Sequence, residues 1–376
     1  MIKMAKTWKR PLFLAFVLIP ILLSLSLSFS PSSSQVGQPS LPTIDYKSVV
    51  NNVNMSAIEG HVRSLSSLGT RMTAYPGGNA SADYIYTFLN SLLGLQNVSF
   101  HTYRVVIPAS YGPYGANITV LSPTPKTLEA YALRPNSMAV VNTGKKPLRG
   151  PLIYVGKGNL EDFDGKAIDG SIVLMDFNSR QHWIQAADLG AKAVIFIEPT
   201  ITTRTEADMK FTYYAPAAFP RLYVKAEDGA WLISQAEAGA EIQVQSNQQW
   251  LYLPAKNVMA YLPGTEHPEL CIILTAYFDT YGVVPMISPG ASEAFGISTL
   301  LELARYFSQN RPKLSILFLA FSGLRQWAAG AREWIEEHFF NKWYNLQTGV
   351  KAAILQSLTL GVDLDINPDT DIILAQ

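Results

Sequence analysis

Apolar residues recur along this 376-residue chain with two different spacings, and the change of spacing divides it into segments. Between residues 46 and 95 they return every three or four positions, which is the spacing of amphipathic helices. The two apolar faces consist of Ile58, Val62, Leu65 and Leu68, and of Ala82, Ile85, Phe88 and Leu92. We therefore expect two helices separated by a turn at 75–78, and then strands at 98–107 and 117–121, where apolar and polar residues alternate.

Short apolar runs alternate with helical segments between residues 151 and 245. The expected strands span 152–155, 171–176, 191–197, 221–224 and 241–245, and the expected helices span 183–189 and 227–238. Alternation of strands with helices is typical of α/β units. We expect residues 148–246 to form a separate α/β domain that follows an N-terminal segment at 46–147.

Residues 247–376 show the same alternation and form the predicted core. Its expected strands span 257–262, 271–276, 314–321 and 352–360, and its expected helices span 297–307 and 327–339. The run 314–321 is apolar at nearly every position, as in parallel strands that are covered on both faces. The sequence predicts an α/β fold with a doubly wound, mostly parallel sheet. Residues 371–376 have the pattern of the first residues of a strand, so we expect the core to be incomplete at its C-terminal end.

The first 30 residues have the pattern of an export signal. Four basic residues among the first ten positions precede an apolar run at 11–29. This run is longer than the ~7–15 apolar residues of a cleaved signal and approaches the ~17–25 residues that span a bilayer. Residues 1–30 are therefore either a signal peptide or a membrane anchor, followed by a linker at 31–45. In both cases we expect the rest of the chain to be extracellular or at the cell surface.

The sequons, the net charge and the cysteine content limit the cellular location and the classes of partner that this chain can have. Asn-x-Ser/Thr sequons, which are possible glycosylation sites in exported chains, begin at Asn54, Asn79, Asn97 and Asn117. The chain has 29 basic and 29 acidic residues, so it lacks the excess positive charge that a nucleic-acid partner requires. Its single cysteine, Cys271, excludes a disulfide within the chain and a thiolate zinc cluster.

Several motifs resemble, in the same order, those of the co-catalytic zinc aminopeptidases of metallopeptidase family twenty-eight. The relatives of this family include glutamate carboxypeptidase, the transferrin receptor and nicastrin. The motifs are the segments 68–71, 76–77, 82–85, 257–264, 300–305 and 318–323, and segment 152–197 is similar to a protease-associated domain. The resemblance implies a zinc-exopeptidase-like core with an inserted protease-associated domain at 148–246.

The metal centre of that family does not carry over. The resemblance implies two zinc ions held by His and carboxylate ligands, with a bridging Asp and a Glu general base. In this sequence Tyr277 takes the place of the first His, and Ser292 that of the bridging Asp. Leu324 and Arg325 replace the Glu–Glu pair, and Leu358 replaces a later Asp. The last His would lie beyond residue 376.

Asp279 and Glu293 are the carboxylates that remain near these positions. Two carboxylates make a weak zinc site, because zinc sites use about three protein ligands. The five histidines fall in other segments, where we expect them on the surface. We expect Asp279 to accept hydrogen bonds at a strand end and Glu293 to lie on a loop surface. Together with the replaced positions they would form a vestigial pocket at the carboxyl ends of the strands, in which Arg325 pairs with Asp279 or Glu293.

Two functions remain open. The first is a peptidase-like protein that is catalytically inactive, uses no cofactor and binds a peptide or a protein. It is favoured because the ligand positions have changed while the packing motifs around them have not. The alternative is an active zinc-dependent aminopeptidase or carboxypeptidase, with ligands from other residues or from a partner chain. A third possibility is a fragment or a degraded gene.

Overall fold

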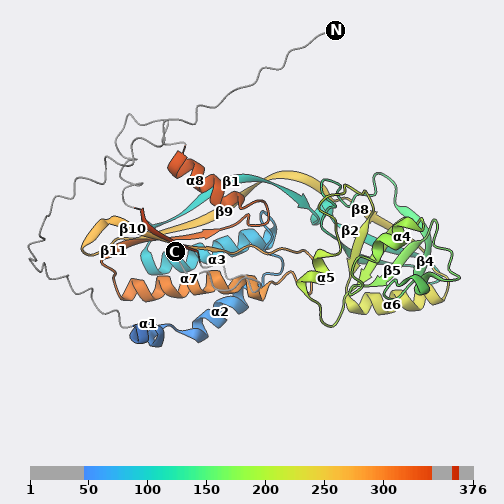
Figure 1. Cartoon of the computed structure of the whole chain (residues 1–376), viewed down its shortest axis with the longest axis horizontal. Coiled ribbons are helices and arrows are strands. Elements are labelled where there is room, and N and C mark those ends of the chain that lie inside the picture. The colour runs from blue at the N-terminus through green and yellow to red at the C-terminus, as the bar shows by residue number, and fades with distance from the viewer. Residues whose placement is uncertain (1–45, 341–357, 364–376) are drawn as a thin grey trace, which may run out of the picture. The chain divides into compact units, whose positions relative to one another are not determined.

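The structure, a computed structural model, describes residues 46–340 and 358–363 (Figure 1). The predicted signal or anchor at 1–30 and the linker at 31–45 lie outside the described residues. The α-helices are α1 (Tyr46–Asn52), α2 (Met55–Ser66), α3 (Pro76–Leu93), α4 (Trp183–Asp188), α5 (Arg204–Asp208), α6 (Ala226–Glu237), α7 (Ala291–Gln309) and α8 (Ala329–Ile335). Shorter helical turns span Gly112–Tyr114, Leu160–Phe163 and Glu336–Phe340. No helix within the described residues is long and apolar enough to cross a membrane.

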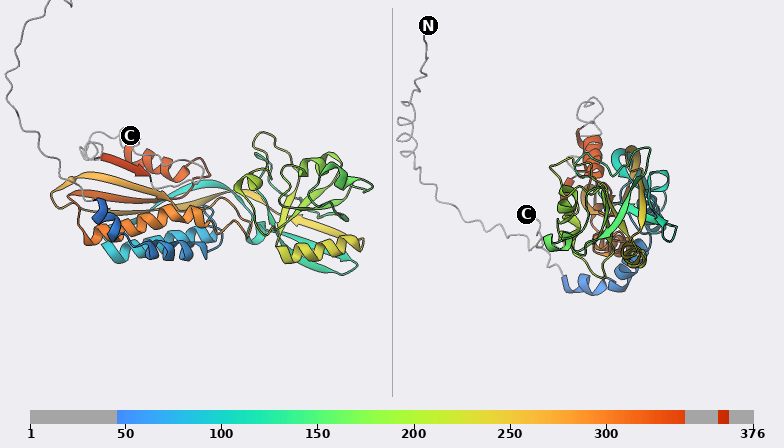
Figure 2. Two further views of the ribbon diagram at one scale, coloured as in Figure 1. Left: turned by 60° about the horizontal axis from the view of Figure 1, so that its bottom comes forward. Right: turned by 90° about the vertical axis from the view of Figure 1, so that its right-hand side faces the viewer.

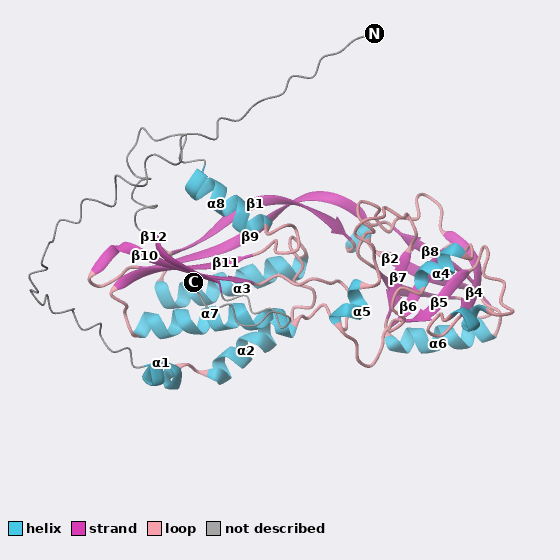
Figure 3. Ribbon diagram, viewed as in Figure 1, coloured by secondary structure: helices cyan, strands magenta, loops and turns pink. Residues whose placement is uncertain are grey.

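The strands form two separate assemblies (Figure 3). Those of the first are β1 (Val98–Ala109), β9 (Gln249–Leu262), β10 (His267–Tyr277), β11 (Leu314–Phe321) and β12 (Leu358–Asp363). Those of the second are β2 (Ala116–Ser122), β3 (Lys126–Ala132), β4 (Leu148–Tyr154), β5 (Ile172–Asp176), β6 (Ala193–Ile197), β7 (Arg221–Val224) and β8 (Glu241–Ser246).

The first assembly is a mixed sheet with the described strand order β1-β9-β11-β10-β12. β10 runs parallel to β11 and β12, as predicted. β9 runs antiparallel to both of its neighbours, β1 and β11, so the prediction of a mostly parallel sheet is only partly right. The reason is that β9 returns along β1 in a twelve-residue antiparallel register, from Val98 opposite Ala260 to Ala109 opposite Gln249. Apolar runs identify strands but contain no information about strand direction.

Helices cover both faces of this sheet. On one face α3 and α7 pack on the sheet, and α2 packs on α7 (Figure 1). The helical stripe Ile297, Leu300 and Leu301 is fully buried in this layer. On the other face Trp334 of α8 packs with Tyr277 and Phe321 at the ends of β10 and β11. Two covered faces explain why β11 is apolar at almost every position. The helix predicted at 327–339 begins at Ala329 and changes after Ile335 from an α-helix to a π-helix, which ends at Phe340.

The second assembly is a closed barrel, which Figure 2 shows from two further sides. Its described strands follow the order β2-β3-β7-β6-β5-β4-β8. The chain enters it after β1 and leaves it into β9, so the barrel is an insertion between two neighbouring strands of the sheet. Its interior contains Ile118, Leu174 and Val244. The barrel begins at β2 and therefore earlier than residue 148, because β2 and β3 pair with β8 and β7.

Candidate functional site

Asp279 is the centre of the candidate site, two residues beyond the end of β10. Its side chain is buried, and its Oδ2 atom accepts three hydrogen bonds. The donors are Thr73 Oγ1 at 2.9 Å, the Gly323 backbone N–H at 3.2 Å and the Leu324 backbone N–H at 3.1 Å. The carboxylate therefore fastens the turn after β11 to the segment that precedes α3.

Burial dominates the electrostatics of this carboxylate. It raises the pKa of Asp279 to about 7, although the hydrogen bond from Thr73 opposes the shift. The nearby charge of Glu293 raises the pKa further. The second oxygen, Oδ1, is buried and has no hydrogen-bond partner among the described residues. An uncompensated buried oxygen favours the protonated acid, so this residue is a poor anion near neutral pH.

Glu293 and Arg325 form an ion pair at the edge of the site. Glu293 lies in the first turn of α7, and its Oε1 atom is 3.7 Å from Nη2 of Arg325. Both side chains are about three-quarters buried, with 27% and 26% of their surface exposed. The Arg325 guanidinium also lies 4.8 Å from the ring centroid of Tyr281. Glu293 is thus a paired helix residue, and our expectation of a loop-surface carboxylate is wrong.

Arg71 holds the loop between β10 and α7 in place. Its guanidinium is fully buried and donates to three backbone carbonyls, those of Phe278 at 3.0 Å, Gly290 at 2.9 Å and Pro289. Burial lowers its pKa to about 10, so the group stays charged at neutral pH. Gly290 has a φ of +53°, and a Cβ there would lie 2.6 Å from both Glu293 Oε2 and the Thr280 side chain.

Arg71 and Thr73 are site residues that the sequence analysis did not assign a role. The segment 68–71 was noted there only as a motif. A charged residue beside a Thr within an otherwise apolar stretch was the available signal, because a buried arginine must find several acceptors.

The structure brings only some of the predicted positions together. Leu324 contacts Asp279 through its backbone, and Tyr277 packs with Phe321 in the cluster under α8. Ser292 is exposed at the start of α7. The backbone of Leu358 pairs with Cys271 near the beginning of β10, so it lies at the other end of that strand from Tyr277.

The histidines do not contribute to the site. His61 and His101 are buried, which corrects the expectation that all five lie on the surface. His61 is 2.7 Å from the Tyr84 hydroxyl, and His101 is 2.9 Å from both Glu337 and Asn257. These contacts satisfy the ring nitrogens within other parts of the core.

The donor set at the site does not fit a di-zinc centre. Asp279 offers one oxygen without a partner, while Glu293 is paired with Arg325. Within the part of the chain that the structure describes, no three His, Cys, Asp or Glu side chains lie close enough to hold a metal ion. The positive charge of Arg325 further disfavours a cation at this place.

Comparison with known proteins gives several relatives, among them a subunit of a complex and an aminopeptidase. The BOS complex subunit NCLN of Rattus norvegicus is 31% identical over 145 residues, which are 37% of this chain and 24% of that protein. Aminopeptidase YwaD of Bacillus subtilis is 28% identical over 203 residues, which are 52% of this chain and 41% of the enzyme. The chain therefore matches about a quarter and two-fifths of the lengths of these relatives.

Among solved structures, the peptidase M28 precursor of Shewanella amazonensis SB2B gives a TM-score of 0.49 at 16% identity. The match covers 84% of this chain and 72% of that one. The sequence profile of peptidase family M28 matches residues 257–357. That segment contains β10, α7 and β11, together with Asp279, Glu293 and Arg325. Residues 257–357 thus match the profile of peptidase family M28, in agreement with the motifs found in the same segment.

Proposed function

We propose that this protein is a catalytically inactive member of peptidase family M28 that is exported and binds a peptide or a protein. The observation that carries the proposal is the Arg325–Glu293 ion pair. It places a guanidinium where the family resemblance implies a metal-binding carboxylate, and it occupies one of the two carboxylates that remain. Asp279, the other one, is buried and has a pKa of about 7.

The rest of the site supports binding rather than hydrolysis. The position implied for the general base is Leu324, which cannot accept a proton from water. Removing a positioned general base typically costs about 10²–10⁴ in rate. Meanwhile Arg71, Thr73 and Gly323 keep the loops ordered through buried hydrogen bonds. Ordered loops without a proton acceptor suit a surface that recognises a ligand without cleaving it.

The relatives leave both functions open. One is named as a subunit of a complex and the other as an aminopeptidase. An active enzyme would need metal ligands from a partner chain or from residues outside those described. We propose that residues 148–246, which form most of the barrel, are a protease-associated domain that supplies part of the ligand-binding surface. Residues 1–30 would direct the chain out of the cytoplasm or anchor it in the membrane.

Metal content and peptidase activity, measured on the same preparation, test this proposal. The purified full chain should contain no stoichiometric zinc, and unblocked aminoacyl substrates should not be hydrolysed with or without added zinc. The bacterial aminopeptidase named above is the positive control, because a chelator should abolish its activity. Near-stoichiometric zinc with chelator-sensitive turnover would replace the proposal with the enzyme alternative.

A further inference from the structure

A pocket of about 850 Å³ lies next to the site and is bordered by segments 281–284 and 325–327. Aromatic side chains line it, among them Phe211, Tyr213, Trp250 and Tyr281. Several are open to solvent, with 54% of Tyr213 and 37% of Trp250 exposed. Aromatic residues and arginine are the side chains that are enriched where proteins bind peptides and other proteins.

Arg134, which follows β3, is the unusual residue of this pocket. Its guanidinium carbon lies 4.9 Å from the ring centroid of Phe211, 5.4 Å from that of Tyr213 and 4.9 Å from that of Tyr281. Within the described part of the chain its guanidinium makes no hydrogen bond and no ion pair. A stacked guanidinium keeps its N–H groups in the plane of the fork, where they remain available to an acceptor.

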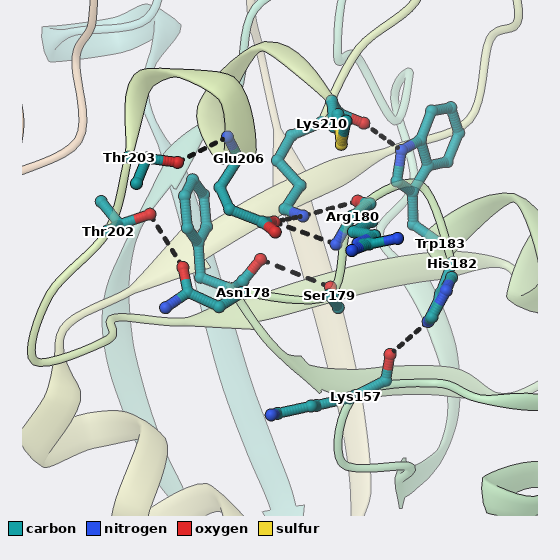
Figure 4. Close-up of polar contacts among 12 residues, drawn as sticks. Lys157, Asn178, Ser179, Arg180, His182, Trp183, Thr202, Thr203, Glu206 and Lys210 are labelled. Carbon is teal, nitrogen blue, oxygen red and sulfur yellow. Dashed lines mark hydrogen bonds and ion pairs between the residues drawn. The ribbon is translucent and has the colours of Figure 1, made fainter.

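The wall that carries Phe211 and Tyr213 is held from beneath by buried polar contacts. The ammonium group of Lys210 donates to the Arg180 carbonyl at 2.6 Å and lies 3.1 Å from Glu206 (Figure 4). Trp183 donates to the Met209 carbonyl at 3.0 Å (Figure 4). Arg221 donates to the carbonyls of Lys210 and Arg134, so one buried side chain fixes the backbone of both segments that line the pocket. The backbone that carries the aromatic side chains is therefore already ordered, and this lowers the entropic cost of binding a ligand.

The charges that line the pocket favour an anion. Among the described residues the lining contains five basic side chains and one acidic side chain, Glu333. Lys210 is paired with Glu206, and Arg325 with Glu293. Tyr213 and Tyr281 have hydroxyl groups 3.2 Å apart, and burial raises the pKa of Tyr281, so the phenol of Tyr281 stays protonated at neutral pH. Arg104, Arg134 and Arg332 have no such partner in this part of the chain. Arg104 donates to the Tyr252 carbonyl, whereas the guanidinium of Arg134 lies among three aromatic rings.

We infer that this pocket binds the carboxylate of a peptide segment, with Arg134 as the main donor and Tyr213 as a second one. The inference rests on the proposed peptide-binding function and names the chemistry of its ligand. Apolar lining residues such as Val284 and Ile287 favour a peptide in which apolar residues flank the carboxylate. A polyanion is disfavoured because the chain has no net charge to attract one.

Matched fluorescent peptides test the inference on the purified full chain by fluorescence anisotropy. The first has a Glu between apolar residues, is N-terminally labelled and is C-terminally amidated. The second has Gln in place of Glu, and the third is the Gln peptide with a free C-terminus. One charge-assisted hydrogen bond corresponds to roughly a tenfold difference in Kd. We expect the Glu peptide or the free C-terminus to bind about tenfold more tightly than the neutral amide, and the tighter of the two identifies the source of the carboxylate.

Two arginine variants locate the binding group. Arg134→Gln should abolish the preference for the carboxylate peptides. Arg149→Gln should leave it unchanged, because Arg149 is an exposed residue of β4 that does not line the pocket. Arg134→Lys keeps the charge without the planar fork, so an intermediate preference is expected. If Arg134→Gln fails to fold, Arg134→Lys tests the assignment to this pocket, and the comparison of peptides on the unaltered chain still tests the preference for a carboxylate.

The outcomes separate this inference from the function on which it rests. Measurable but equal binding of all three peptides would overturn the carboxylate inference and leave peptide binding intact. An unaltered preference in folded Arg134→Gln would overturn the assignment to this pocket. Failure of every peptide to bind would overturn both the inference and the peptide-binding proposal.

Discussion

Arg325 and Glu293 lie 3.7 Å apart at the edge of the candidate site, one in the turn after β11 and the other in the first turn of α7. The pair joins two segments that the family resemblance associates with metal ligands. It neutralises the carboxylate of Glu293, which is about three-quarters buried, with a guanidinium whose charge is fixed. The carboxylate of Glu293, which could bind a metal ion, instead connects the turn after β11 to the start of α7.

The first prediction is that restoring the acidic pair does not restore peptidase activity. In the double variant Leu324→Glu and Arg325→Glu, hydrolysis of aminoacyl substrates should stay at background with added zinc. The reason is that Tyr277 and Ser292 still occupy the implied histidine and bridging positions. The double variant should also be less stable, because it removes the partner of Glu293 and places like charges nearby.

The matched control is a second double variant, which combines Leu324→Gln with Arg325→Gln. The thermal unfolding temperatures of the two double variants are compared. The Gln variant removes the ion pair without adding negative charge, so it should unfold at a higher temperature than the Glu variant. Zinc-dependent hydrolysis by the Glu variant would contradict the view that several ligands are missing.

The second prediction concerns the pH dependence of stability. The pKa of Asp279 is raised from 3.8 to about 7 in the folded protein, so the folded state binds this proton more tightly than the unfolded state. Proton binding by Asp279 therefore stabilises the folded state fully below pH ~4, and this stabilisation is lost as the pH rises to about 7. Asp279→Asn should therefore be more stable than the natural chain above pH 7, by up to about 4 kcal/mol, and the difference should shrink as the pH falls toward 4.

Urea unfolding between pH 4 and pH 8 measures this difference. Asp83→Asn is the control, because Asp83 is exposed and pairs with Lys256 on the surface. Its effect should be small throughout. A constant difference between Asp279→Asn and the natural chain across the pH range would show that this carboxyl group does not titrate as described.

Local patterns predicted the elements of this fold better than their assembly. The stripe at Ile297, Leu300 and Leu301 and the run 314–321 indicated α7 and β11, since burial imposes a period on the sequence. The direction of β9 was missed because it depends on the insertion that separates β9 from β1. The strand β3 was missed too, although Leu128, Ala130 and Ala132 alternate with exposed residues, because its apolar side chains are mostly small.

The candidate site was only partly predictable for a similar reason. The neighbourhood of Asp279 and Leu324 followed from their places at the ends of adjacent parallel strands. The contribution of Thr73 could not be derived, because it lies 206 residues before Asp279 and meets it only through the packing of α3 on the sheet. Arg134 likewise acquires its role from rings that lie far away in the sequence.

The third prediction is that Arg71→Ala strongly destabilises the fold. The change leaves the carbonyls of Phe278, Pro289 and Gly290 buried without their donor. Breaking such a network typically costs about 3–5 kcal/mol. Arg63→Ala is the matched control, because Arg63 is 76% exposed and pairs with Glu59 within one helix, so its loss should cost at most about 0.5 kcal/mol. Equal urea midpoints for the two variants would contradict the anchoring role of Arg71.

The fourth prediction concerns glycosylation, and it follows from the proposed export. Asn54 and Asn117 are exposed. The Asn54 side-chain oxygen caps α2, and its side-chain nitrogen has no hydrogen-bond partner among residues 46–340 and 358–363. Asn97 is half-buried, and its amide nitrogen donates to the Leu93 carbonyl at 2.7 Å. Attaching a glycan to that nitrogen removes a hydrogen atom and crowds the end of α3. In a glycosylating host we expect occupancy at Asn54 and Asn117, little at Asn97, and an intermediate level at Asn79, which is half-buried in the first turn of α3.

Mass spectrometry of peptides from the secreted chain, before and after enzymatic removal of glycans, measures the occupancy of each sequon. Single Asn→Gln variants at Asn54, Asn97 and Asn117 provide the control, since only the occupied sites should change electrophoretic mobility when lost. Transfer of glycans occurs on the chain as it enters the secretory pathway, so complete absence of modification in all variants would argue against export through residues 1–30. High occupancy at Asn97 would instead show that the glycan is attached before the end of α3 folds, because in the folded chain the Asn97 amide nitrogen donates to the Leu93 carbonyl.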